Sequence, residues 1–167
     1  FALTSASMSD GRRAPVPFIG RTEELAALHD AFEAAADGLV VALVGGDPGV
    51  GKTSLAQAFA RMLRADGVPV HWGSCVELGG APPFWPWVQV VRSIGDHAVD
   101  TARADLEARA EREPFAAFDA LHQVLRTNAG QTRVIVLDDL HAADLGSLEL
   151  LRFLVSSAAD LPVLVVG

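Results

Sequence analysis

Cysteine is almost absent from this sequence, which contains Cys75 and no other. A single thiol cannot form an internal disulfide, and without a second thiol nearby it cannot anchor a cysteine-rich metal site. Scaffolds held together by disulfides or by cysteine-bound metal are therefore excluded. Such a composition fits a reducing compartment, and we expect a cytoplasmic location.

Positive charge is scarce as well. Lysine and arginine together number 13, against 21 aspartate and glutamate residues, which gives a formal net charge of -8. A surface that neutralises nucleic-acid phosphates needs the opposite balance. We therefore expect no direct nucleic-acid binding by this segment.

Long apolar runs are missing too. Each run meets glycine or charge well short of the roughly 20 residues that a membrane helix needs, so no membrane contact is expected. The opening, Phe1 to Asp10, lacks the basic start and long apolar stretch of a signal peptide. We interpret residues 1–15 as a disordered or cloning-derived leader.

What the sequence does contain is enough apolar material for a core, because 50% of its 167 residues are hydrophobic. On length alone this favours one globular domain, which we place at residues 16–167. Leu161 to Gly167 has the pattern of a buried strand and stands at the end of the sequence. We therefore expect the N-terminal, incomplete portion of a domain from a longer protein, whose C-terminal domains would be partners.

The first half of the chain predicts two strands and two helices. Thr22 is predicted to cap a helix whose Leu25, Leu28 and Phe32 fall on one face and which ends at Gly38. The continuous apolar run Leu39–Val44 is typical of a strand buried on both faces of a parallel sheet. A helix from Lys52 to about Asp66 and a short strand, Val68–Trp72, are predicted next. The apolar face of that helix is predicted to hold Leu55, Ala56, Phe59, Met62 and Leu63.

The second half continues the alternation. A helix is predicted to open at Phe84–Val88, with Pro86 tolerated in its first turn, and to run to about Ile94. Residues 96–113 are charged and alanine-rich, which indicates a solvated helix or a mobile connection. Pro114 is predicted to start another helix, and Thr132–Leu137 a third strand. Asp144 is then predicted to cap a helix with one apolar face, made by Leu145, Leu148, Leu151 and Leu154.

Strands that alternate with helices indicate a parallel β-sheet between two layers of helices. The alternation therefore predicts an α/β fold of three layers, with a parallel sheet between helices, truncated after the fourth strand. The motif that specifies the P-loop lies directly after the first predicted strand.

Gly46 to Thr53 matches the pattern G-x-x-x-x-G-K-[ST] in full, between an apolar strand and an amphipathic helix. A triphosphate offers only negative oxygens, and glycines let backbone N–H groups approach them while the helix N-terminus adds partial positive charge. The alternative is a glycine-rich turn that only joins strand to helix, but such a turn has no need for Lys-Thr at the mouth of the helix. The predicted nucleotide contacts are Gly46, Asp47, Pro48, Gly49, Val50, Gly51, Lys52, Thr53 and Ser54.

Two side chains of this motif carry specific chemistry. Lys52 is predicted to reach the β- and γ-phosphates as a flexible point charge and so to take part in catalysis. The hydroxyl of Thr53 is predicted to ligate Mg²⁺. The predicted ligands are therefore ATP or ADP together with Mg²⁺.

Asp138 and Asp139 follow a buried strand and supply the second half of such a site. Burying unpaired charge is costly, so packing alone does not justify two carboxylates there. We interpret Asp138 as a Mg²⁺ ligand, acting through water or beside Thr53, and Asp139 as the general base that polarises an attacking water. The alternative for Asp139 is an exposed, inert residue that begins a turn.

Five segments in order resemble the ATPase domain of the STAND group of signal-transduction NTPases, within the AAA-like P-loop proteins. The resemblance covers about residues 16–167 and implies a three-layer P-loop NTPase fold of the ASCE or AAA-like type. It is closest to the domains at the front of large bacterial LuxR-type transcriptional regulators and related cyclase or kinase hybrids. The segments are Phe18–Leu25, Gly45–Thr53, His71–Cys75, Ala81–Trp87 and Leu137–Asp144.

The resemblance implies further roles for residues of this chain. It places Ile19, Gly20 and Arg21 near the adenine, with Arg21 and Glu24 as a polar signature; the alternative is that Glu24 is a helix-start acid and Arg21 a surface charge. His141 could sense the γ-phosphate or could be structural. Family members often carry tryptophan where this chain has Ala143, a departure that leaves the nucleotide site unaffected.

The sequence therefore predicts an ATP/Mg-binding regulatory switch in a larger bacterial signalling or transcription-regulating protein. Hydrolysis would be slow in the intact protein and weak or absent in this segment. Two alternatives stay open: a small-molecule phosphotransferase built on the same loop, and a scaffold that binds no nucleotide and only contacts other proteins.

Overall fold

The fold is described from a computed structural model of the chain, which covers residues 21–76, 82–94, 114–127, 130–158 and 160–167. The predicted leader, Ile19, Gly20 and the predicted charged segment at residues 96–113 lie outside the described residues. The side chains of residues 114–117 and 127 are not described either.

Four strands form one sheet in the described part of the chain, in the order β1-β4-β3-β2, and every neighbouring pair is parallel. The register sets Val41 beside Val165, and Ser74 beside Asp138. The strands are β1 (Val40–Ala42), β2 (Val70–Ser74), β3 (Arg133–Asp138) and β4 (Val163–Val166).

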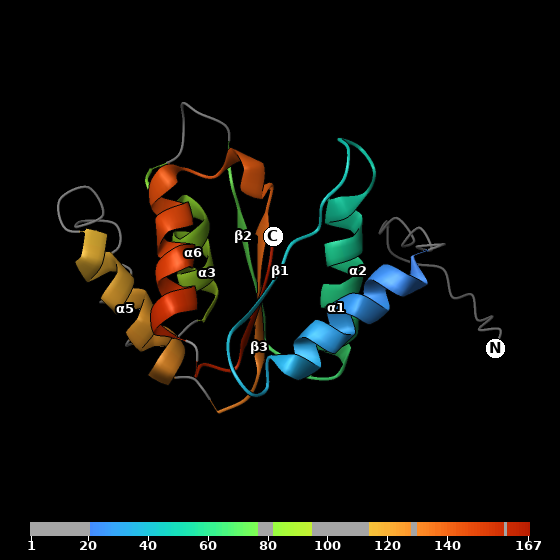
Figure 1. Cartoon of the computed structure of the whole chain (residues 1–167), viewed down its shortest axis with the longest axis horizontal. Helices are drawn as coiled ribbons and strands as arrows, with labels where there is room; N and C mark the ends of the chain where they lie inside the picture. The colour runs from blue at the N-terminus through green and yellow to red at the C-terminus, as the bar shows by residue number, and fades with distance from the viewer. Residues whose placement is uncertain (1–20, 77–81, 95–113, 128–129, 159) are drawn as a thin grey trace, which may run out of the picture.

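Helices cover both faces of this sheet, so the domain has three layers (Figure 1). One face carries α1 (Thr22–Ala34) and α2 (Lys52–Ala65). The other carries α3 (Trp85–Ile94), α5 (Pro114–Thr127) and α6 (Leu145–Ser157), and the short 3₁₀ helix η1 (Leu140–Ala142) follows β3. The predicted parallel α/β fold with flanking helices is confirmed.

The strand β3 lies between two hydrophobic cores because its side chains alternate between the faces of the sheet. Val134 and Val136 belong to the core beneath α1 and α2. Ile135 and Leu137 belong to the core beneath α3, α5 and α6. All four are almost fully buried, which explains why this strand has a continuous apolar sequence.

Three details of the predicted helices are wrong. Thr22 is the first residue of α1 and not its cap; the N-cap is Arg21, whose side chain makes no capping hydrogen bond. Met62 is 43% exposed, because α2 turns only one side towards the sheet. Leu145 and Leu148 are also exposed, since α6 faces the sheet with the side that carries Ser147, Leu150, Leu151 and Leu154.

The first two strands differ from their predicted form as well. β1 is half-buried, and Leu43 beyond it is 70% exposed. In the described sheet β1 pairs only with β4 and so lies at an edge. β2 starts two residues later than predicted, because the amide of Val68 still donates to the carbonyl of Leu63 as α2 ends.

The edge strand β2 packs unusually close to α3. A Cβ built on Gly73 would lie 2.2 Å from the carbonyl oxygen of Pro86, so only glycine fits there. The side-chain amide of Gln89 bonds the backbone of Ser74, donating to its oxygen at 3.0 Å and accepting from its nitrogen at 3.3 Å. This amide satisfies the backbone of a residue that, in the described sheet, has no neighbouring strand on that side.

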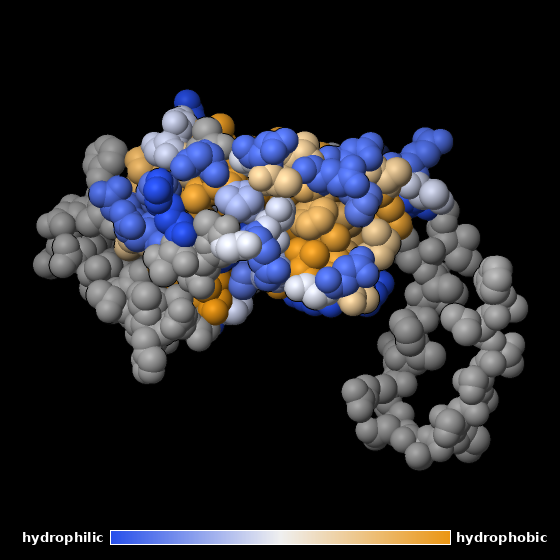
Figure 2. All heavy atoms as spheres, turned by 90° about the horizontal axis from the view of Figure 1, so that it is seen from below, coloured by the Kyte–Doolittle hydropathy of each residue, from blue (hydrophilic) through white to orange (hydrophobic). Residues whose placement is uncertain are grey.

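The end of the molecule at which the strands begin is shown in Figure 2. Apolar side chains gather in the middle of this face, with hydrophilic ones around them. Within the part of the chain that the structure describes, no helix combines the length and apolar character that crossing a membrane requires.

Candidate nucleotide site

The loop from Gly45 to Gly51 joins β1 to α2 at the end of the sheet where the strands finish. Gly49 and Gly51 have φ angles of 78° and 93°. These angles fall in the left-handed region, which glycine enters at little cost and most other residues avoid. Gly49 and Gly51 therefore allow the tight curvature of the loop.

The start of α2 leaves its first backbone amides free of a side-chain cap. Gly51 is the N-cap and has no side chain that could accept from them. Uncapped amides at a helix N-terminus, with the partial positive charge of the helix, form a binding site for anions. The local sequence thus provides a phosphate-binding geometry before any side chain is considered.

Lys52 lies across this loop. Its Nζ donates to the carbonyl oxygen of Gly46 at 2.7 Å and to that of Asp47 at 3.1 Å. The ammonium group is therefore held inside the turn of the loop. From there a small movement of a flexible side chain exchanges carbonyl oxygens for phosphate oxygens.

Thr53 and Asp138 meet although they belong to different elements. The hydroxyl Oγ1 of Thr53, in the first turn of α2, donates to Oδ1 of Asp138 at 2.9 Å. Oδ1 also accepts from the backbone amide of Asp139 at 3.2 Å, and the backbone oxygen of Asp138 accepts from the amide of Cys75. The carboxylate is thus fixed at the mouth of the phosphate-binding loop.

Asp139 makes the sharp turn at which β3 ends. Its φ of 55° and ψ of 44° place a non-glycine residue in the left-handed region, a conformation that aspartate tolerates better than most residues. The side chain is exposed. The turn brings both Asp139 and the following η1 to the wall of the cavity described below. Asp139 is thus an exposed turn residue, and its role as a general base stays a prediction.

A cavity of about 680 Å³ lies between the phosphate-binding loop and η1. Its walls combine the loop, the start of α2, the end of β3 and the end of β4. It is lined by Val44, Gly45, Gly46, Pro48, Gly49, Gly51, Lys52, Thr53, Ala56, Val136, Leu137, Asp138, Asp139, Leu140, His141, Val166 and Gly167. Its position past the carboxyl ends of parallel strands is where ligands bind in open α/β sheets.

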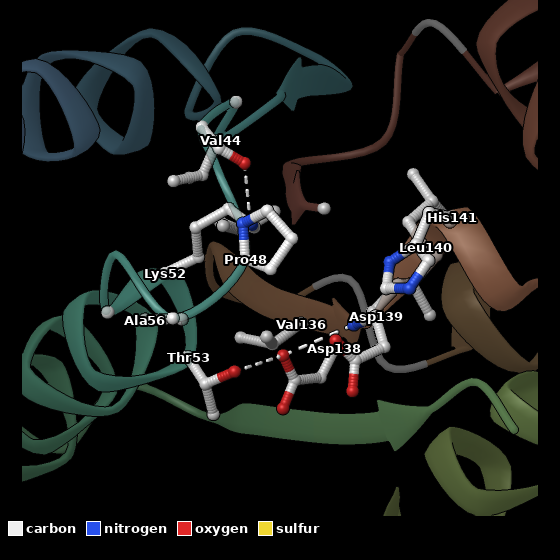
Figure 3. Close-up of a pocket in the computed structure, with 17 residues that line it drawn as sticks. Val44, Pro48, Lys52, Thr53, Ala56, Val136, Asp138, Asp139, Leu140 and His141 are labelled. Carbon is white, nitrogen blue, oxygen red and sulfur yellow. Dashed lines mark hydrogen bonds between the residues drawn. The ribbon is translucent and has the colours of Figure 1, made fainter.

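His141 lies on η1, across the cavity from Lys52 and Pro48 (Figure 3). Asp138 and Asp139 lie between these two sides in the same view. Contact between His141 and a terminal phosphate stays a prediction. The apolar lining residues, among them Leu140 and Val44, were not predicted as site residues, because in the sequence they are indistinguishable from core positions.

The predicted contact residues are not all on the cavity wall. Asp47, Val50 and Ser54 are exposed and do not line it. Arg21 does not line it either; its Nη2 donates to the carbonyl oxygen of Val50, and its Nη1 lies 3.7 Å from Oε1 of Glu24. The contact with Val50 was not foreseen from the sequence.

Cys75 is buried next to this site. Burial raises the pKa of its thiol to about 11, and the carboxylates of Asp144, Asp139 and Asp138 add to the shift by repelling a thiolate. At neutral pH the group is therefore a neutral, buried thiol. Its backbone amide, and not its sulfur, serves the site by holding the carbonyl oxygen of Asp138.

The oxygen donors of Thr53 and Asp138 fit Mg²⁺. This ion favours oxygen ligands, takes only one or two from protein and fills its other positions with phosphates and water. The described residues contain no cluster of three or more histidine, cysteine or acidic side chains arranged to hold a metal. A hydroxyl and a carboxylate in contact beside a phosphate-binding loop match the one or two protein ligands that Mg²⁺ takes.

A family model described as an AAA ATPase domain matches residues 17–166. No curated protein matches the chain.

Proposed function

Because this chain belongs to the AAA ATPase domain family, a family that implies nucleotide binding, we propose that it binds ATP with Mg²⁺ and acts as a regulatory switch. The observation that carries the proposal is the contact of Thr53 with Asp138 at the mouth of the phosphate-binding loop. It brings a hydroxyl and a carboxylate, the two donors expected for phosphate-bound Mg²⁺, next to the amides expected for phosphate.

Each residue of the site has a distinct part in this proposal. The loop amides and Lys52 bind the phosphate chain, and Thr53 with Asp138 would hold Mg²⁺. When bound, Mg²⁺ neutralises charge on the phosphates. Asp139 is exposed and at the cavity wall, where it can accept a proton from an attacking water.

Hydrolysis in this proposal is slow and resets the switch. Contact of the terminal phosphate with His141, on the turn between β3 and α6, would bias the arrangement of domains in a longer protein. We place that protein in the STAND group, among cytoplasmic bacterial signalling proteins such as LuxR-type regulators. The five segments that resemble this group support the assignment.

Lys52 offers a direct test because it is the only lysine in the chain. We expect Lys52→Ala to lower the affinity for ATP·Mg²⁺ by at least about tenfold in isothermal titration, since it removes a charge from the phosphate site. Arg61→Ala is the matched control: it removes an exposed positive charge from the same helix. ATP should also protect Lys52 from an amine-acetylating reagent.

Other outcomes would redirect the proposal. Absence of binding heat for ATP and ADP, with no Mg²⁺ dependence, would contradict it and favour a scaffold that binds no nucleotide. Consumption of ATP that depends on an added acceptor molecule would favour a phosphotransferase instead. An unchanged affinity in Lys52→Ala would show that the loop is not where the nucleotide binds.

A further inference from the structure

Arg21 contacts the phosphate-binding loop from outside the cavity. Its guanidinium donates to the carbonyl oxygen of Val50, and the same nitrogen lies 4.0 Å from where a Cβ on Gly51 would be. Arg21 does not belong to the cavity lining, whereas Gly51 does. The Arg21 side chain therefore contacts the carbonyl end of the Val50–Gly51 peptide from outside the cavity. Gly51, at the other end of that peptide, lines the cavity.

The geometry of the Val50–Gly51 peptide bond links the contact of Arg21 to the direction of the Gly51 amide. In a trans peptide the carbonyl of Val50 and the N–H of Gly51 point in opposite directions. The described residues contain no cis peptide bond. A guanidinium that holds the Val50 carbonyl on the outside therefore keeps the Gly51 amide turned towards the cavity.

The loop needs this external contact because glycine itself restricts rotation of the backbone very little. Gly51, at a φ of 93°, has no side chain to restrict rotation of the neighbouring peptide. The Val50 side chain is 44% exposed and therefore restricts the peptide only in part. Arg21 provides an external contact at this point of the loop.

Arg21 is itself held in place. Its side chain is 22% exposed, and Glu24, one turn further along α1, lies 3.7 Å away. The planar guanidinium can serve both partners because its donors are arranged as a fork. The start of α1 is thereby connected to the loop between β1 and α2.

We propose that Arg21 is a positioning residue for phosphate binding: it holds the Val50–Gly51 peptide so that the Gly51 amide is directed at the phosphates of the nucleotide. The proposal rests on the proposed function, since it requires that the loop binds phosphates. It differs from a contact with the base, because it predicts that Arg21 affects every ligand that carries the phosphate chain, including one without adenine.

Inorganic tripolyphosphate with Mg²⁺ separates the two roles. We expect Arg21→Ala to lower the affinity for ATP·Mg²⁺ and for tripolyphosphate·Mg²⁺ by the same factor, about tenfold, as measured by isothermal titration. Arg21→Lys should recover part of the loss, because it keeps the charge and a donor. Arg61→Ala serves as the control for loss of one positive charge.

A second measurement does not depend on ligand. In the amide NMR spectrum of the unliganded protein, Arg21→Ala should shift the Gly51 signal and leave that of Leu164, in the buried strand β4, unchanged. If Arg21→Ala does not fold, Glu24→Gln is the milder variant, and it should weaken both ligands equally but by a smaller factor.

The outcomes distinguish failure of the positioning role of Arg21 from failure of the proposed nucleotide binding. If the unaltered protein binds neither ligand, the proposed function fails. If it binds both and Lys52→Ala weakens both, yet Arg21→Ala weakens only ATP, Arg21 acts on the base and the positioning role is overturned. The role is also overturned if Arg21→Ala changes neither affinity nor the Gly51 signal.

Discussion

Thr53 donates a hydrogen bond of 2.9 Å to Asp138, across 85 positions of sequence. The hydroxyl comes from the first turn of α2 and the carboxylate from the end of β3. Between β1, which leads to α2, and β3 lies the strand β4. The pair therefore depends on the strand order of the whole sheet, and it is the feature from which the magnesium dependence of the site can be predicted.

Asp138→Asn removes the negative charge but keeps an oxygen that can accept from Thr53. We expect the affinity for ATP in Mg²⁺ to fall by about tenfold, while the affinity in EDTA changes little, because only the metal-bound form uses the charge. Isothermal titration under both conditions measures this difference. Asp119→Asn, at an exposed position of α5, is the control; an equal loss with and without Mg²⁺ would argue against metal binding by Asp138.

Asp139→Asn tests the predicted general base. General-base catalysis contributes about a hundredfold or more, so phosphate release should fall by at least about that factor. The affinity for ATP should stay within about twofold, because Asp139 makes no contact that forms the phosphate-binding loop. Because hydrolysis is expected of the intact protein, the assay uses a longer protein that contains this domain, and phosphate release equal to that of its unaltered form would contradict the role.

Gly73→Ala tests the packing of β2 against α3. The added methyl would lie 2.2 Å from the backbone oxygen of Pro86, which cannot rotate away as a side chain could. We expect the free energy of unfolding to fall by about 3 kcal/mol, at the upper end of overpacking effects. Urea denaturation measures it, and Gly130→Ala, where nothing lies within 4 Å, should change it by less than about 0.5 kcal/mol.

The environment of His71 allows us to predict how the free energy of unfolding depends on pH. Its Nδ1 lies 2.8 Å from Oγ of Ser93, and that hydroxyl donates to the carbonyl oxygen of Val90 at 2.7 Å. The histidine nitrogen must therefore be the donor in its own bond. Burial, with the charges of Arg133 and Arg64, lowers the pKa of His71 from 6.5 to about 4.

The direction of this pH dependence follows from the protons bound in the folded and unfolded states. Between pH 6.5 and 4 the unfolded chain binds a proton at His71 and the folded chain does not, so stability falls as the pH falls through this window. The slope from this group is at most about 1.4 kcal/mol per pH unit. His71→Gln should remove it, and a difference between the two proteins that is constant from pH 6.5 to 4 would show that His71 does not titrate as inferred.

Much of the phosphate-binding loop could be predicted because its determinants are local. Glycine spacing, the apolar run before it and the helical periodicity after it are all contained in one stretch of chain. The cap of α6 is local in the same way: the side chain of Asp144 accepts from the amide of Ser147, as predicted. Periodicity could not indicate that Leu145 and Leu148 are exposed, because a pattern identifies a face but not whether another element covers it.

By itself, the sequence determined the alternation of strands and helices, the chemistry of the loop and the pair of aspartates after a buried strand. Only the tertiary structure decided that Asp138 meets Thr53, that β1 lies at an edge of the described sheet, and that Arg21 contacts Val50. The physical reason is distance along the chain. Neighbouring residues dictate local conformation, whereas contacts between remote residues depend on strand order and helix packing, which the whole core sets together.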